Sequence, residues 1–184
     1  MEEIRIYCEN DRRYHTFPMG TDLKTISDSI YPSASLAALV NNQLKELSFK
    51  IMTTNTVRFI DYDHPDGRRT YIRSLCFVLQ NVIREMYPEK VLVIDYSLPS
   101  GLYCEIREKE EMYDGRPKVY FVTDEELERI QARMKEIIDA DLPFEKTKQT
   151  LEDTVKLFEA NGQKEKVNLA RSLGRITYSV YFLD

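Results

Sequence analysis

The sequence predicts an α+β protein whose residues 1–62 form a β-grasp domain. The segments IRIYCEN and YHTFP have the composition of strands, and the turn residues Asn10 and Asp11 separate them. A helical pattern follows Gly20, and three apolar segments of strand length come after it. Two strands, a helix and further strands within about 60 residues are the order of a β-grasp, in which a mixed sheet curls over one helix.

The elements of this first domain follow from local patterns. Thr21 is expected to cap the helix, and Leu23, Ile26 and Ile30 would supply its buried face. The later strands are expected in LAALVNNQL, KELSFKI and TVRFIDY, which polar residues separate. We place the end of the domain just before a predicted turn at Pro65, Asp66 and Gly67.

The second predicted domain spans residues 63–184 and is also α+β. Its first element is a helix over residues 74–88, because apolar residues recur there at i, i+3 and i+4 and Pro88 ends the pattern. Strands are expected in VLVIDYSL, LYCEIRE and KVYFV, and a capping box of Thr123 and Glu126 predicts the start of the next helix. A helix capped by Thr150, another ending at Gly174 and a strand in ITYSVYFLD complete the domain. Because that strand pattern runs to Asp184, we expect this domain to be truncated at its C-terminal end.

Composition excludes several classes of protein. The 184 residues are 42% hydrophobic and 31% charged, with a net charge of −5. No apolar run approaches the roughly 20 residues that span a bilayer, and the first residues do not resemble a signal peptide, so we expect a cytoplasmic protein without a membrane partner. Three widely spaced cysteines favour reduced thiols.

Motifs for common chemistries are missing from the sequence. The six glycines form no phosphate-binding loop, and His15 and His64 are the only histidines, so neither a nucleophilic triad nor a zinc site is indicated. Arg68 and Arg69 are candidates for phosphate contacts, although solvated surface charge is the commoner role for such pairs. A second stripe on the helix over residues 74–88 places Ser74, Phe77 and Asn81 one above another.

Longer segments resemble two modules of the threonyl-tRNA synthetases. FPMGTDLKTISDSI, ALVNNQLKELSFKI and TVRFID resemble the TGS module, a ubiquitin-like β-grasp domain. IRSLCFVLQNVIREMYP, GLYCEI and DEELERIQARMKEIIDADLPFEK resemble the adjoining editing domain, the α+β second additional domain of threonyl- and alanyl-tRNA synthetases. The resemblance spans nearly the whole chain and implies this order of domains.

The resemblance also shows where the chain departs from the family. The synthetase helix carries a His-x-x-x-His pair, and the matching positions here are Phe77 and Asn81, with Ser74 where a third histidine often lies. A phenyl ring and a carboxamide neither transfer protons nor form a metal site, so we expect no catalytic residue and no metal. Two alternatives remain for the site itself. Arg73, Ser74 and Asn81 could bind a small polar ligand with Tyr103 as a wall, or Phe77 could fill the cavity.

The altered helix predicts a non-catalytic binding or regulatory region. Nucleoside kinases similar to uridine kinase combine such modules with a later kinase domain, so the resemblance implies a kinase domain beyond residue 184 as partner, with ATP and magnesium bound there and no cofactor in this region. The alternative is a divergent aminoacyl-tRNA editing or tRNA-binding region of a threonyl-tRNA synthetase-like protein. RNA is thus a second possible partner, and its affinity would depend on salt.

Overall fold

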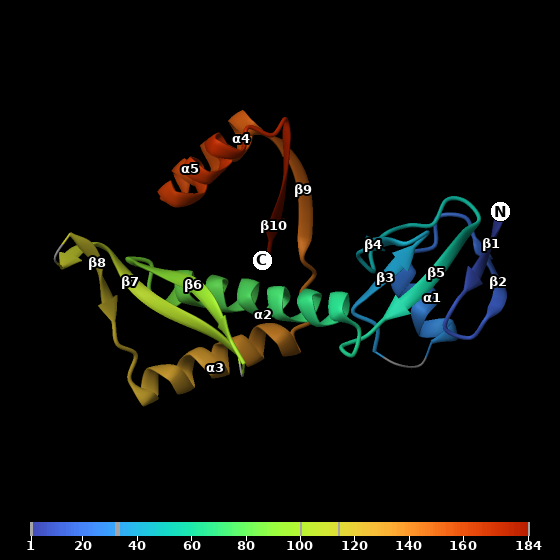
Figure 1. Cartoon of the computed structure of the whole chain (residues 1–184), viewed down its shortest axis with the longest axis horizontal. Helices are drawn as coiled ribbons and strands as arrows, with labels where there is room; N and C mark the ends of the chain where they lie inside the picture. Colours follow the sequence, from blue (N-terminus) through green and yellow to red (C-terminus); the bar gives the residue numbers. More distant parts are fainter. Residues whose placement is uncertain (1, 32–33, 100, 114, 184) are drawn as a thin grey trace. The chain divides into compact units, whose positions relative to one another are not determined.

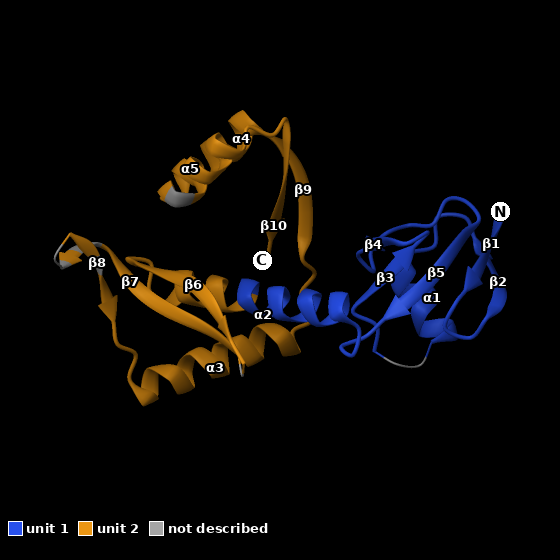
Figure 2. Cartoon of the chain, in the orientation of Figure 1, with its two compact units in different colours: residues 1–77 blue, residues 78–184 orange. Residues whose placement is uncertain are grey.

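A computed structural model describes residues 2–31, 34–99, 101–113 and 115–183 of the chain. Contacts between residues divide the chain into two compact units, Met1–Phe77 and Val78–Asp184 (Figure 2). The long helix α2 (Pro65–Met86) contributes residues to both units. Each unit is an α+β structure, which confirms the predicted fold class, and each is described by itself below.

The first unit contains a five-stranded mixed sheet in the order β2-β1-β5-β3-β4 (Figure 1). Its strands are β1 (Glu3–Cys8), β2 (Arg13–Pro18), β3 (Ala37–Val40), β4 (Gln43–Lys45) and β5 (Asn55–Ile60). Strands β1 and β5 are parallel, and the other neighbours are antiparallel. The helix α1 (Leu23–Ile30) packs on one face of this sheet, which completes the predicted β-grasp.

The core of this unit lies between the sheet and α1. Alternate residues of β1 and β5 point inward, as the twofold period of a strand requires. The fully or almost fully buried residues of this core include Ile6, Cys8, Leu23, Ile26, Ile51, Val57 and Phe59. Of the three cysteines, Cys8 is buried, Cys76 is partly buried and Cys104 is exposed.

Two details of the first unit differ from the sequence predictions. The N-cap is Asp22, whose side chain accepts a hydrogen bond from the Thr25 backbone N–H, whereas the Thr21 hydroxyl donates to the Pro18 carbonyl. The strand expected over KELSFKI ends at Lys45. The reason is that its backbone bonds to the helix instead, because the carbonyls of Leu47 and Phe49 accept from the first N–H groups of α1.

The prediction of a turn at Pro65, Asp66 and Gly67 was wrong, because these residues form the first turn of α2. Proline suits the first helical position, where its missing N–H leaves no intrahelical bond unmade, and a carboxylate in the first turn interacts favourably with the helix dipole. Gly67 is buried there, and a Cβ atom at this position would lie 1.7 Å from the carbonyl oxygen of Asp61. Close packing of the two backbones therefore requires glycine.

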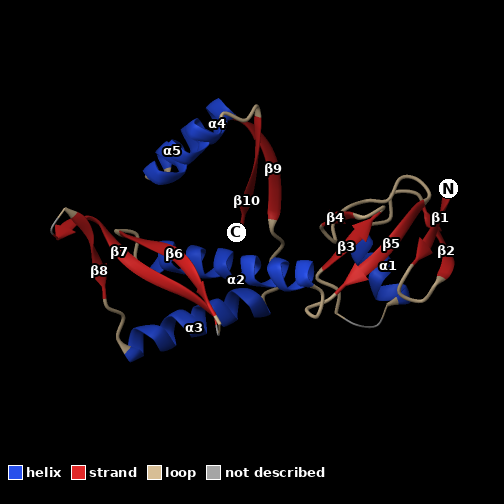
Figure 3. Ribbon diagram, viewed as in Figure 1, coloured by secondary structure: helices blue, strands red, loops and turns tan. Residues whose placement is uncertain are grey.

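The second unit combines an antiparallel three-stranded sheet, the end of α2 and three later helices with a separate two-stranded antiparallel sheet (Figure 3). Its elements after α2 are β6 (Lys90–Leu98), β7 (Gly101–Tyr113), β8 (Arg116–Tyr120), α3 (Asp124–Asp139), β9 (Glu145–Thr150), α4 (Leu151–Ala160), α5 (Lys164–Leu173) and β10 (Thr177–Phe182). The residues buried in this unit include Val82, Ile83, Leu92, Ile106, Ile130 and Ile137.

The capping predictions for this unit are confirmed. Thr123 and Glu126 form both bonds of the capping box at the start of α3, Thr150 caps α4, and Gly174 follows α5 with a left-handed φ of 56°. The polar segment of β9 gave no strand signal, yet it pairs residue by residue with β10. In the described part of the chain, no helix is both long enough and apolar enough to cross a membrane.

Candidate functional site

The residues predicted to line a remnant of the editing pocket fall on one helix and one strand. Arg73, Ser74 and Phe77 belong to the first unit, and Asn81 and Tyr103 belong to the second. On α2, Arg73 is exposed, and Ser74, Phe77 and Asn81 are partly buried. The Oδ1 of Asn81 accepts a 2.6 Å hydrogen bond from Nη2 of Arg84, one turn further along the helix. The stripe of Ser74, Phe77 and Asn81 therefore offers no group that titrates near neutral pH.

Tyr103 makes its contacts on the sheet. Its ring stacks on Tyr96 with centroids 4.8 Å apart, and its hydroxyl donates to Glu105. Because Ile106 is buried and side chains alternate along β7, the Tyr103 ring lies on the opposite face of the strand from Ile106. The described side-chain contacts of Tyr103 and Asn81 do not include each other, so the predicted pocket wall remains a prediction.

An exposed group of aromatic and basic side chains lies where β5 leads into α2. The rings of Tyr62 and Tyr71 meet edge to face with centroids 5.2 Å apart, and their residues are 47% and 42% exposed. The guanidinium of Arg68 lies 5.5 Å from the centre of the Tyr62 ring. Arg69 is ion-paired with Asp66, whereas Arg68 and Arg73 have no carboxylate partner among the described residues. We call Tyr62, Tyr71 and Arg68 the tyrosine–arginine cluster.

A polar network in the second unit centres on Glu126. Its carboxylate accepts from the Thr123 backbone N–H at 3.0 Å, from the Tyr120 hydroxyl at 2.5 Å and from the Tyr87 hydroxyl at 3.2 Å. The Thr123 backbone bond, and next the Tyr120 bond, lower the pKa of this carboxyl to about 2. Because each oxygen is already hydrogen-bonded, the network holds α3 against the ends of α2 and β8 and leaves no free base.

Lys90 extends this network toward the sheet. Its ammonium contacts Glu89 at 2.9 Å and Glu108 at 3.0 Å, and it lies 4.4 Å from the centre of the Tyr120 ring. The bond to Glu89, followed by that to Glu108, raises the pKa of Lys90. Two carboxylates and one ring face therefore surround the ammonium, as expected for a structural ion pair. Across the described ranges, no three His, Cys, Asp or Glu residues are grouped closely enough to hold a metal ion.

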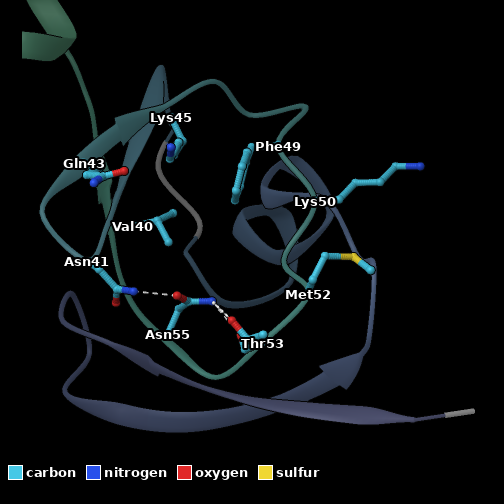
Figure 4. A pocket seen from close by; sticks show the side chains of 9 residues that line it. All are labelled: Val40, Asn41, Gln43, Lys45, Phe49, Lys50, Met52, Thr53 and Asn55. Carbon is cyan, nitrogen blue, oxygen red and sulfur yellow. Dashed lines mark hydrogen bonds between the residues drawn. The ribbon is translucent and has the colours of Figure 1, made fainter.

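The first unit also contains a hollow that no sequence pattern predicted. It has a volume of about 250 Å³ (Figure 4) and is lined by Val40, Asn41, Gln43, Lys45, Phe49, Lys50, Met52, Thr53 and Asn55. These residues come from the β3–β4 hairpin, the loop after β4 and the start of β5. The signal in the sequence was the Asn41–Asn42 pair between two short strands, which is typical of a tight turn with positive φ.

Comparison with known proteins gives a consistent set of relatives. No family model matches the sequence. Over 150 residues the chain is 28% identical to the threonine–tRNA ligase of Carboxydothermus hydrogenoformans, which covers 82% of this chain and 22% of that protein. Over 175 residues it is 26% identical to the threonine–tRNA ligase of Acidithiobacillus ferrooxidans, which covers 95% of this chain and 26% of the relative. The chain resembles one region of threonine–tRNA ligases.

This similarity agrees with the resemblance of both domains to synthetase modules. A further threonine–tRNA ligase, from Acetivibrio thermocellus, is 28% identical over 157 residues, which are 84% of this chain and 23% of that protein. The chain therefore spans about a quarter of the length of the relatives it matches. The relatives support the threonyl-tRNA synthetase-like alternative over the uridine kinase-like one.

Proposed function

We propose that this chain is a threonyl-tRNA synthetase-like region that binds RNA and does not hydrolyse aminoacyl esters. The observation that carries the binding part is the exposed tyrosine–arginine cluster. Base stacking on tyrosine contributes about 1–3 kcal/mol per base, and arginine adds contacts with phosphate and with the ring faces. Tyr62 and Tyr71 are exposed, and Arg68 lies over Tyr62. Rings for base stacking and a guanidinium for phosphate contacts therefore occur together.

The charge around the cluster sets the expected strength of binding. Asp66 neutralises Arg69, and Asp61 and Asp63 precede the helix, so Arg68 is the cation of the cluster that remains available. One phosphate contact on a single strand gives a slope of about −0.7 in a plot of log affinity against log salt concentration. The affinity should therefore rise only a few-fold from physiological to low salt.

The side chains of α2 support the absence of hydrolysis. Ester hydrolysis needs a group that takes up or delivers a proton, and the synthetase-like positions hold the Phe77 ring and the Asn81 carboxamide. The oxygen of that carboxamide is already bonded to Arg84. A bound aminoacyl ester would meet no general base on this stripe.

Two measurements on the whole chain test the proposal. Fluorescence anisotropy with labelled tRNA across a salt series should give saturable binding at low salt, and Tyr62→Ala together with Tyr71→Ala should weaken it at least tenfold. Arg58→Gln, which changes another exposed arginine of the first unit, is the matched control and should leave the affinity unchanged. A mischarged tRNA should be deacylated no faster than in buffer alone, with alkaline hydrolysis as the positive control. If no tRNA bound at low salt, the RNA-binding part of the proposal would be wrong. If the chain deacylated the tRNA, the part that excludes hydrolysis would be wrong.

A second proposal concerns the protein to which this region belongs. The loss of imidazoles at positions 77 and 81 also suits the N-terminal region of a uridine kinase-like nucleoside kinase, in which ATP and magnesium would bind to a later domain. A GxxxxGK[ST] motif encoded after residue 184 and ATP-dependent phosphorylation of uridine by the longer protein would support it. A cysteine and histidine pair encoded there instead would favour a synthetase-like hydrolase.

A further inference from the structure

The hollow of the first unit has a lining whose charge is opposite to that of the chain. Two of its nine lining residues are lysines, Lys45 and Lys50, and none is acidic, whereas the whole chain has a net charge of −5. Three amide side chains also line it, and Phe49 is 39% exposed. Cationic, amide and aromatic groups thus meet around one concave surface, which shares no residue with the α2 stripe or the tyrosine–arginine cluster.

One side of the hollow is fixed by side-chain hydrogen bonds. Nδ2 of Asn41 donates to Oδ1 of Asn55 at 2.6 Å, and Nδ2 of Asn55 donates to the carbonyl oxygen and to Oγ1 of Thr53 (Figure 4). Oδ1 of Asn41 accepts from the Thr56 backbone N–H at 2.9 Å. Asn55 has therefore used both amide hydrogens, whereas Asn41 keeps one. The Gln43 amide makes no hydrogen bond within the described residues and remains free to bind a ligand.

The other side of the hollow is formed by Lys45 and Phe49. The ammonium of Lys45 lies 5.0 Å from the centre of the Phe49 ring, and Lys45 has no carboxylate partner in the described part of the chain. Lys45 is half-buried as a residue. Figure 4 shows Lys45 and Phe49 facing each other at the hollow, with Lys50 extending away from it. A cation held only by a ring face gains a stronger partner when an anion arrives.

We propose that this hollow binds a small organic anion in which a carboxylate or phosphate is joined to a flat apolar group. The anion would contact the Lys45 ammonium and the Gln43 amide, and the flat group would pack on Phe49. The volume of about 250 Å³ equals about eight water molecules at ~30 Å³ each, which suits a molecule the size of benzoate or phenyl phosphate. Larger ligands fill pockets of about 300–1,000 Å³.

The test is a titration of the ¹⁵N-labelled whole chain, monitored by amide chemical shifts. Benzoate and phenyl phosphate represent the two kinds of anion, and benzyl alcohol has the same ring without the charge. We expect saturable shifts at residues 41–55 with at least one anion, and at least about tenfold weaker binding of benzyl alcohol. The tighter of the two anions identifies the ligand class. Equal binding of benzyl alcohol, or no shift up to the solubility limit of either anion, would overturn the proposal.

Variants separate the two contacts of the ligand. Lys45→Met keeps the aliphatic stem and removes the charge, so it should weaken the anion about tenfold. Lys24→Met is the matched control, because Lys24 pairs with Asp28 on α1 and does not line the hollow. Phe49→Leu should weaken benzoate but leave any shifts caused by acetate unchanged. If Lys45→Met bound as tightly as Lys24→Met, the charge contact would be excluded.

The outcome is independent of the proposed RNA binding. Lys45 is not part of the tyrosine–arginine cluster, so Lys45→Met should leave tRNA affinity at low salt unchanged. Conversely, Tyr62→Ala should leave the anion titration unchanged. A loss of both activities in either variant would indicate misfolding, which the thermal unfolding midpoint of each variant reports directly.

Discussion

The side chains of Asn41 and Asn55 join the β3–β4 turn to the first residue of β5 through a 2.6 Å hydrogen bond. Asn41 has a left-handed φ of 49° and also accepts a bond from the Thr56 backbone N–H. Asparagine tolerates this conformation better than other residues with a side chain, because its short amide bonds locally. One residue thus serves both the turn and the edge of the hollow.

Replacing Asn41 with alanine should therefore destabilise the protein by about 2–3 kcal/mol, because both the hydrogen bonds and the tolerance of positive φ are lost. Urea unfolding measures the change. Asn42→Ala is the matched control, since Asn42 has a φ of 63° and none of the side-chain hydrogen bonds described for Asn41. An equal loss in the two variants would show that the hydrogen bonds of Asn41 contribute nothing.

Gly67→Ala should be among the most damaging single substitutions. Its Cβ would overlap the backbone oxygen of Asp61, which cannot move without displacing the end of β5 or the start of α2. Overpacking in a close-packed interior costs about 1–3 kcal/mol, and a backbone clash lies at or above the upper end of that range. Gly101→Ala meets no atom within 4 Å and should change the free energy of unfolding by less than about 0.5 kcal/mol.

Glu126 should make stability depend on pH in acid. Its pKa is about 2 in the folded protein against an ordinary value of 4.5, so the unfolded chain binds more protons between these values. The stabilisation is fully present above pH 4.5 and is lost as the pH falls toward 2. The difference in unfolding free energy between the wild type and Glu126→Gln should therefore be constant near neutrality and shrink in this window.

The two tyrosines of this network should differ in their effect. Tyr120 donates to Glu126 at 2.5 Å, and Tyr87 donates at 3.2 Å. Removing the Tyr120 hydroxyl should therefore raise the pKa of Glu126 more than removing the Tyr87 hydroxyl does. Titration of the Glu126 side chain by NMR in Tyr120→Phe and Tyr87→Phe compares them. A larger shift in Tyr87→Phe would contradict this ranking.

The ion pair between Arg133 and Glu85 should couple α2 and α3 only weakly. The guanidinium contacts the carboxylate at 3.1 Å through two of its nitrogens, but Arg133 is 40% and Glu85 49% exposed. Exposed pairs typically contribute about 0.2–1 kcal/mol. A double-mutant cycle with Arg133→Ala and Glu85→Ala should give a coupling energy in that range, which decreases in high salt. The cycle of Lys135 and Asp139, a pair within α3, is the comparison.

The sequence predicted most of the fold because local signals agreed with the final packing. The strands of the β-grasp and the caps at Thr123, Thr150 and Gly174 follow from residue types whose effects extend over a single turn. The missed elements depend on distant partners. Strand β9 is polar and forms only through its pairing with β10, and the expected strand after Lys45 was lost because its carbonyls bond to α1.

The candidate sites were harder to predict for the same reason. Arg68 and Arg69 were found as a basic pair, but only the structure shows that Asp66 pairs with Arg69 and that Arg68 lies over Tyr62. The hollow combines residues from a turn, a loop and a strand, and no short motif marks such a combination. Sequence spacing reports neighbours within one element, whereas a concave surface depends on how several elements meet.

The buried position of Gly67 bears on how the β-grasp unit can be produced alone. A fragment that ends at residue 62, where strand composition ceases, would lack the helical turn that packs closely on the Asp61 backbone. A fragment that ends at Phe77 would retain this cover together with the tyrosines and arginines beside it. A β-grasp fragment made for crystallisation or ligand screening should therefore include the first half of α2.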